Sequence, residues 1–233
     1  MPDFATHLRY EGDFGHFQVS GLARPIGYRP TGGDTTRKAA YSLSAGTTFH
    51  PWAYLIGSNP VRKDNPNALE RCRIIGQYTF GSGIGRYIND EVGQGLDGQV
   101  DPATGAFDLL YTAAYVVGYE HWYTERWLSN FTYLQTLVGS DGDQPSSTYI
   151  GAKYLGVSLW YIPIRNLPLG VEYLWGEREN ADGRGERPTG STRRCSTISD
   201  GARQIAIAGS VQPTALFSSH CLFPGTAILL SLP

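Results

Sequence analysis

Eight stretches of the chain alternate between apolar and polar residues, and this period of two is the strongest constraint on the fold. A β-strand points successive side chains to opposite faces, so alternation is typical of strands with one apolar and one polar face. The stretches are residues 4–10, 16–24, 38–49, 72–81, 107–122, 127–136, 153–162 and 169–178. The pattern predicts an all-β fold, an antiparallel up-and-down meander of about eight strands.

The segments between these stretches also alternate, in their length. Short turns are expected at 11–15, 123–126 and 163–168, and long segments rich in Gly, Asp and Pro at 29–37, 82–106 and 137–152. Short turns at one end and long loops at the other are typical of a transmembrane β-barrel of the outer membrane. The connector 50–71 is the exception, because it is long where the alternation predicts a short turn.

The chemistry of the two faces favours the same architecture. The apolar face carries aromatic residues near the strand ends, where the interfacial girdles of a membrane barrel would lie. These residues are Phe4, Tyr10, Phe49, Trp127, Tyr161 and Trp175. The other face carries small polar residues with isolated charges, which suits a water-filled lumen. A soluble antiparallel β-sandwich could show similar alternation and is the alternative.

Composition divides the chain near residue 180. Residues 1–179 hold 27 of the 29 aromatic residues, and the remainder is rich in Ser, Thr and Arg without alternation. We therefore expect a partial β-barrel over 1–180 and an irregular tail over 181–233, with short ordered pieces at 204–211 and 227–232. One hypothesis is that the tail, from about residue 183, is translated out of frame.

The ends and the charge of the chain add further expectations. The first residues contain neither a basic segment nor an apolar one, so we expect no signal peptide in this chain. The formal net charge of −2 gives no reason to expect nucleic acid as a partner. The chain contains no run of 18 apolar residues of the kind that forms a transmembrane helix.

Four segments resemble the DcaP-like family of outer-membrane porins. They are residues 81–90, 119–130, 153–160 and 169–180, and their order and spacing match over about 4–180. The resemblance implies a trimeric porin of about sixteen strands in the bacterial outer membrane, for passive diffusion of small anions such as dicarboxylates. It also implies that this chain is a fragment, the C-terminal half of the barrel without its last strand. We expect such a half-wall of about eight strands to be curved but open, because small side chains on the polar face cannot fill a closed eight-strand barrel.

The candidate site is a set of pore-lining, anion-selecting residues on the polar face. The set comprises His7, Arg9, Arg24, Arg73, Gln77, Glu120, Glu172 and Arg178. Guanidinium groups in a narrow lumen attract carboxylates and bind them through two hydrogen bonds, and Arg9 and Arg24 are expected to contribute most. The alternative is that the arginines pair with Glu120 and Glu172 across the strands and neutralise one another.

Two other classes of function remain open beside the porin. A soluble β-rich binding module would bury the aromatic face, and an outer-membrane hydrolase would need a Ser, a His and an acidic residue at a triad spacing. No such spacing stands out, and the glycines of 81–87 precede no helical pattern that would form a phosphate site. We therefore expect no enzyme, cofactor or metal site. The expected partners are small anionic solutes, outer-membrane lipid and, for a complete barrel, two further copies in a homotrimer.

Overall fold

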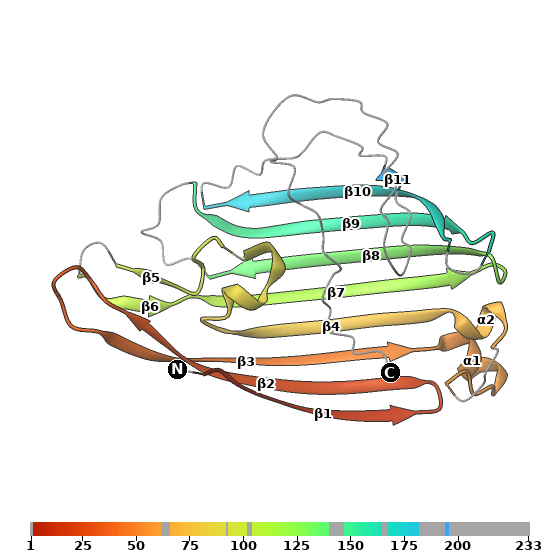
Figure 1. Cartoon of the computed structure of the whole chain (residues 1–233), viewed down its shortest axis with the longest axis horizontal. Coiled ribbons are helices and arrows are strands. Elements are labelled where there is room, and N and C mark those ends of the chain that lie inside the picture. Colours follow the sequence, from red (N-terminus) through yellow and green to blue (C-terminus); the bar gives the residue numbers. More distant parts are fainter. Residues whose placement is uncertain are drawn as a thin grey trace.

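Eight long strands form one antiparallel meander in the computed structural model (Figure 1). The model describes residues 2–61, 66–91, 93–101, 104–139, 147–164, 167–181 and 194–195. The strands are β1 (Phe4–Gly12), β2 (Gly15–Tyr28), β3 (Thr36–Phe49), β4 (Arg73–Ser82), β7 (Tyr111–Trp122), β8 (Trp127–Val138), β9 (Tyr149–Tyr161) and β10 (Leu169–Asn180). Each strand pairs with the next of these along the chain. The predicted all-β meander is confirmed.

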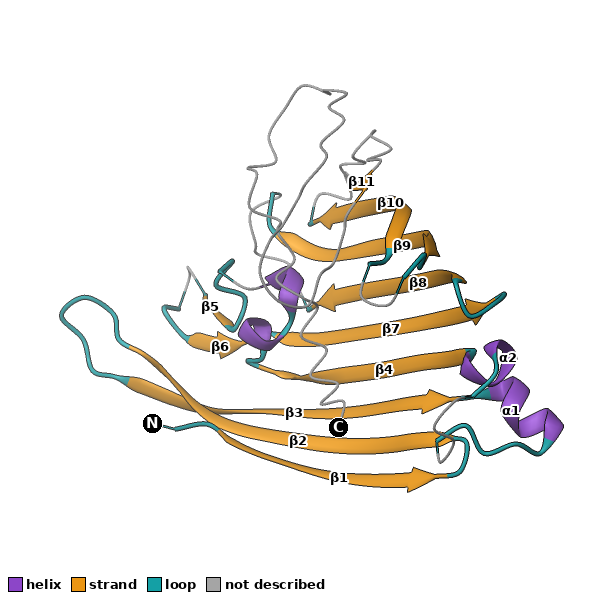
Figure 2. Cartoon of the chain, turned by 45° about the vertical axis from the view of Figure 1, so that its right-hand side comes forward, coloured by secondary structure: helices purple, strands orange, loops and turns teal. Residues whose placement is uncertain are grey.

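The sheet is curved and open, as expected. Its strand order runs from β1 at one edge to β11 (Arg194–Cys195) at the other, so within the described part of the chain no pairing closes a barrel. Figure 2 shows the strands stacked as one bent wall. Strand β11 pairs with β10 over two residues, Val171 opposite Cys195 and Glu172 opposite Arg194.

Short turns join β1 to β2, β7 to β8 and β9 to β10 at one end of the sheet, which we name the turn end. The connector between β3 and β4 lies at the same end and contains α1 (Pro51–Ile56) and α2 (Ala68–Arg71) (Figure 1). A capping box begins α2, with the Asn67 side chain accepting from the Glu70 backbone and Glu70 accepting from the Asn67 backbone. Two short helices therefore occupy the connector that is unexpectedly long in the sequence.

The opposite end, the loop end, carries a long segment that folds back over the sheet. This inserted loop (83–110) contains η1 (Gly85–Tyr87), η2 (Asn89–Glu91), β5 (Gly98–Val100) and β6 (Phe107–Leu109). Gly83 starts it with a φ of 71°, which favours glycine. Leu96 and Leu110 of this loop form a buried cluster with three residues of β8 and β9, Val138, Tyr149 and Ala152.

Two boundaries differ from the sequence-based expectation. The stretch 107–122 is two strands, because 107–109 pair with β5 while β7 begins at Tyr111. In the tail, β11 lies at 194–195, where no ordered piece was expected. Residues 204–211 and 227–232 lie outside the described residues, and the division of the chain at 180 stays a prediction. Among the described helices, none is both long and apolar enough to cross a membrane.

Candidate functional site

The strand register places all eight predicted site residues on one face of the sheet, which we name the polar face. Arg9 lies opposite Gln18 and His7 opposite Ser20, while Arg73 lies opposite Glu120. The pairing runs from β1 to residue 179 without a register shift, so the face of each side chain can be followed from strand to strand. It places Arg24, Gln77, Glu172 and Arg178 on the same face. The predicted set therefore shares one surface.

The opposite, aromatic face is uncovered. Leu43, Tyr78, Phe131, Val157 and Tyr173, from five different strands, are each 41–49% exposed. The described residues include no second sheet packed on this face, since the other sheet is only the β5–β6 hairpin of the inserted loop. A soluble sandwich would bury these side chains, whereas in the described part of the chain they are exposed.

Arg73 and Glu120 form an ion pair across β4 and β7 near the turn end. An Arg73 terminal nitrogen lies 3.2 Å from Glu120 Oε2, and Trp122 Nε1 donates to the other carboxylate oxygen at 2.8 Å. Further along β4, Gln77 donates to Ser44 and Thr79. The alternative of mutual neutralisation across strands therefore describes Arg73 and Glu120, whereas Gln77 belongs to a neutral hydrogen-bond network.

The remaining residues of the turn half have fewer contacts. Arg9 pairs with Glu11 on its own strand at 2.9 Å. His7 is exposed on β1 and lies opposite Ser20. Glu172 is half-buried on β10, opposite Ser158, and no ion pair joins it to another described residue. Glu172 is thus a carboxylate on the polar face, and the register places Arg194 of β11 opposite it.

Arg24 lies in a buried cluster rather than in an open lumen. Its two terminal nitrogens donate to the two Asp97 carboxylate oxygens, each at 3.3 Å, and one also donates to the Gly83 carbonyl. Its side chain is 4% exposed. Asp3 and Arg86 complete the cluster, with Arg86 Nε 3.6 Å from Asp97. The geometry makes Arg24 an anchor for the inserted loop, a role that the sequence-based expectation of a selecting residue did not include.

Arg178 differs from the other arginines of the predicted set. Its Nε donates to Asn180 Oδ1 at 2.9 Å, and its guanidinium carbon lies 5.4 Å from the centre of the Tyr149 ring. Among the residues that the structure describes, no carboxylate lies within ion-pair distance of it. Both terminal nitrogens can therefore bind an incoming carboxylate, and Tyr149 restrains the plane of the guanidinium.

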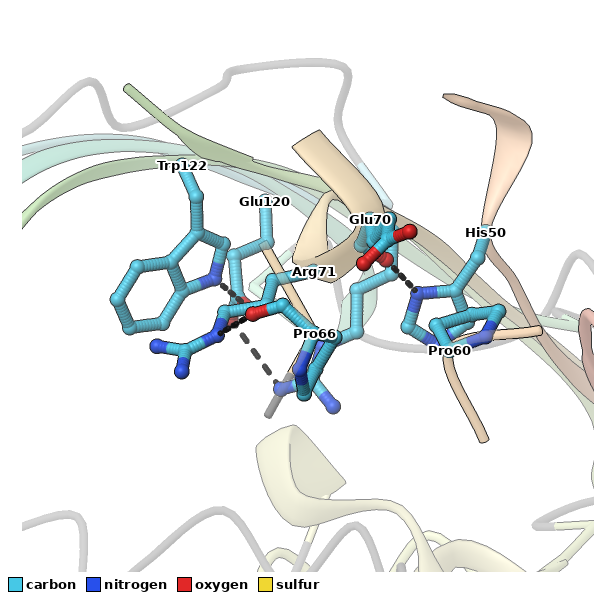
Figure 3. A pocket seen from close by; sticks show the side chains of 8 residues that line it. His50, Pro60, Pro66, Glu70, Arg71, Glu120 and Trp122 are labelled. Carbon is cyan, nitrogen blue, oxygen red and sulfur yellow. Dashed lines mark hydrogen bonds and ion pairs between the residues drawn. The ribbon is translucent and has the colours of Figure 1, made fainter. Parts of the chain in front are cut away.

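A cavity of about 260 Å³ lies at the turn end, between α2 with its flanking residues and the polar face (Figure 3). His50 Nδ1 lies 3.0 Å from the Glu70 carbonyl and Arg71 Nε donates to the Pro66 carbonyl. Arg71 also lies over the Trp122 ring, 5.1 Å from its centre. Burial lowers the pKa of His50, and a smaller contribution from Arg73 acts in the same direction. The cavity wall therefore includes the Arg73–Glu120 pair and a histidine that favours its neutral form.

Sequence reasoning missed the partners of Arg24. Asp97 is 73 residues away, and alternation says nothing of where a long loop folds. The positive φ of Gly83 marks a turn within the run of glycines before Arg86. The length of the connector 50–71 was the available signal for the helices and the cavity at the turn end.

The fold and the polar face together define a class of architecture: an antiparallel meander wall with one apolar and one polar surface. A solved structure with the same architecture is the outer membrane channel DcaP of Acinetobacter baumannii, at a TM-score of 0.54 and 15% identity. The similarity covers 79% of this chain and 50% of that one, so the chain spans half the length of the channel. No family model and no curated protein matches the chain.

Proposed function

We propose that this chain forms part of the wall of an outer-membrane pore for passive diffusion of small anionic solutes, with dicarboxylates as the substrate class. The observation that carries the proposal is the separation of chemistry between the two faces. An uncovered aromatic face suits lipid, and a polar face with arginines suits a water-filled lumen. The similarity to a channel structure supports transport rather than catalysis.

Anion preference, in this proposal, comes from the location of unpaired charge rather than from net charge. Arg9, Arg24 and Arg73 each have a carboxylate partner, and Arg178 has none among the described residues. Arg178 lies near the loop end of β10 and Glu172 six residues away toward the turn end, about 20 Å along the strand. A carboxylate entering from the loop end meets Arg178 before it meets the repulsion of Glu172.

The complete barrel, by its resemblance to the DcaP-like porins, is proposed to contain about sixteen strands and to assemble as a homotrimer. Half of such a wall exposes unpaired backbone groups at its edges, which lipid tolerates poorly. Completion of the barrel removes these edges. The function is therefore a property of the closed barrel, to which this chain supplies one contiguous part.

The test is the reversal potential in a planar bilayer under a salt gradient, with the sheet in a barrel completed to its full strand number. We expect anion preference in the parent, a lower preference in Arg178→Gln and a higher one in Glu172→Gln. The two variants change charge in opposite directions on one strand, so each is the control for the other. Cation preference in the parent, or no change in either variant, would contradict the proposal.

A further inference from the structure

Helix α1 presents an unusually apolar surface for a connector. On this six-residue helix Tyr54, Leu55 and Ile56 are 57–69% exposed and Trp52 is 40% exposed, whereas Ala53 is fully buried. The helix has no acidic residue in its first turn and no basic residue in its last. Ala53 faces the protein, and Leu55 and Ile56 face outward.

Direct contacts fix α1 to the aromatic face of the sheet rather than to the polar face. Trp52 Nε1 donates to the hydroxyl of Tyr119 at 2.7 Å, and Tyr119 belongs to the aromatic face of β7. The Tyr54 ring lies 5.9 Å from that of Phe49, the last residue of β3. Helix α1 therefore extends the aromatic face beyond the ends of β3 and β7.

The contacts on the other side of α1 hold it in this position. The Tyr54 ring meets Phe14, in the turn between β1 and β2, edge to face at 5.2 Å. The backbone N–H of His50 donates to the Phe14 carbonyl at 2.8 Å. A helix tied to β3, to β7 and to the β1–β2 turn has a defined place at the turn end.

Aromatic residues at strand ends lie at the same end of the sheet as α1 (Figure 1). Trp127 and Tyr161 stack at 4.7 Å on neighbouring strands of the turn end, and Tyr123 is exposed in the turn beside them. Tryptophan and tyrosine prefer the interface between lipid headgroups and acyl chains, and leucine and isoleucine prefer the acyl side. The composition and the place of α1 therefore match a phospholipid surface.

We propose that α1 is an interfacial anchor, which places Leu55 and Ile56 in the lipid leaflet at the turn end while Trp52 and Tyr54 lie at the headgroup boundary. The inference rests on the proposed function, because it requires the aromatic face to contact lipid. It adds a contact outside the strands, at the connector that the alternation predicted to be a short turn. The ligand is a phospholipid surface rather than a single bound molecule.

The test uses the full chain, with its three cysteines replaced by serine, reconstituted in phosphatidylethanolamine–phosphatidylglycerol liposomes. Single cysteines are introduced by Leu55→Cys on α1, Val157→Cys on the aromatic face and Glu11→Cys on the polar face at the turn end. Each is labelled with bimane, and quenching by brominated phospholipid is measured. Ile56→Cys repeats the α1 measurement should Leu55→Cys fail to fold.

We expect brominated lipid to quench the labels at Leu55 and Val157 at least twofold more than the label at Glu11. Quenching at Val157 with none at Leu55 or Ile56 would overturn the anchor and leave the pore proposal intact. No quenching at Val157 would contradict both the lipid anchor and the pore proposal. Oxidative cross-linking of two copies through Leu55→Cys, without quenching, would assign α1 to an interface between copies and overturn the lipid anchor.

Discussion

In the proposed pore, direct pairing across β4 and β7 decides how Arg73 and Glu120 act on a passing ion. Each neutralises the other at 3.2 Å, and both side chains are partly exposed to the polar face. Pairs of this kind contribute little free energy, about 0.2–1 kcal/mol. Their effect on an ion in the lumen should therefore appear when one partner is removed, not when both are present.

A double-mutant cycle tests this neutralisation in the completed barrel. We expect Glu120→Gln to raise the anion-to-cation permeability ratio about two- to threefold, and Arg73→Gln to lower it by a similar factor. The double variant should return close to the parent ratio, because the two charges cancel. A double variant that behaves as Arg73→Gln alone would show that Glu120 does not screen Arg73.

At the scale of elements, the inserted loop is held by one buried arginine. Arg24→Ala leaves the Asp97 carboxylate with Arg86 alone, and we expect the local opening of the loop to become easier by about 2 kcal/mol. Hydrogen exchange over the described parts of 83–110 measures this change. Arg29→Ala, at an exposed position in the next connector, is the matched control and should leave exchange unchanged. Unaltered exchange in Arg24→Ala would refute the anchoring role.

The connector with α1 and α2 should weaken in mild acid through His50. Burial lowers the His50 pKa below its ordinary value of 6.5, so the folded connector favours the neutral imidazole more than the unfolded chain does. The stability that neutral His50 provides is present above pH 6.5 and is lost as the pH falls through the folded pKa.

We therefore expect faster hydrogen exchange in 50–61 and 66–72 at pH 5.5 than at pH 7.5, after correction for the intrinsic rate. His50→Gln removes the titrating group and should abolish the difference between the two pH values. A pH dependence that persists in His50→Gln would assign the effect to another group.

Strands and helices differ in how far the sequence predicts them. Residues 169–178 alternate without interruption, and β10 covers Leu169–Asn180. Alternation also predicts to which face of the sheet each side chain points, which is why the predicted site residues share one face. Residues 52–56 are apolar throughout and carry no period, so the only sequence signals for a helix there are the length of the connector, Pro51 at its start and Gly57 just past its end. The Arg24–Asp97 contact depends on the path of a loop 73 residues downstream, and spacing carries no information about that path.

Across the whole molecule, one layer of strands separates an apolar face from a polar one. Apolar side chains left in water would cost free energy in proportion to their area, and the aromatic face is exposed over several strands. Lipid against the aromatic face and water against the polar face would place both sets of side chains in a favourable environment. Within the described residues, the sheet ends at β1 on one side and at β11 on the other.

The most direct measurement of this central claim is residue-by-residue accessibility along β3 in liposomes. Ser42→Cys, Leu43→Cys, Ser44→Cys and Ala45→Cys are mild substitutions that alternate between the two faces. In the completed barrel without other cysteines, we predict that a membrane-impermeant thiol reagent labels positions 42 and 44, and that a lipid-soluble quencher reaches labels at 43 and 45. Protection of 43 and 45 from both probes would indicate a buried sandwich core, and aqueous labelling of all four would contradict a wall between lipid and water.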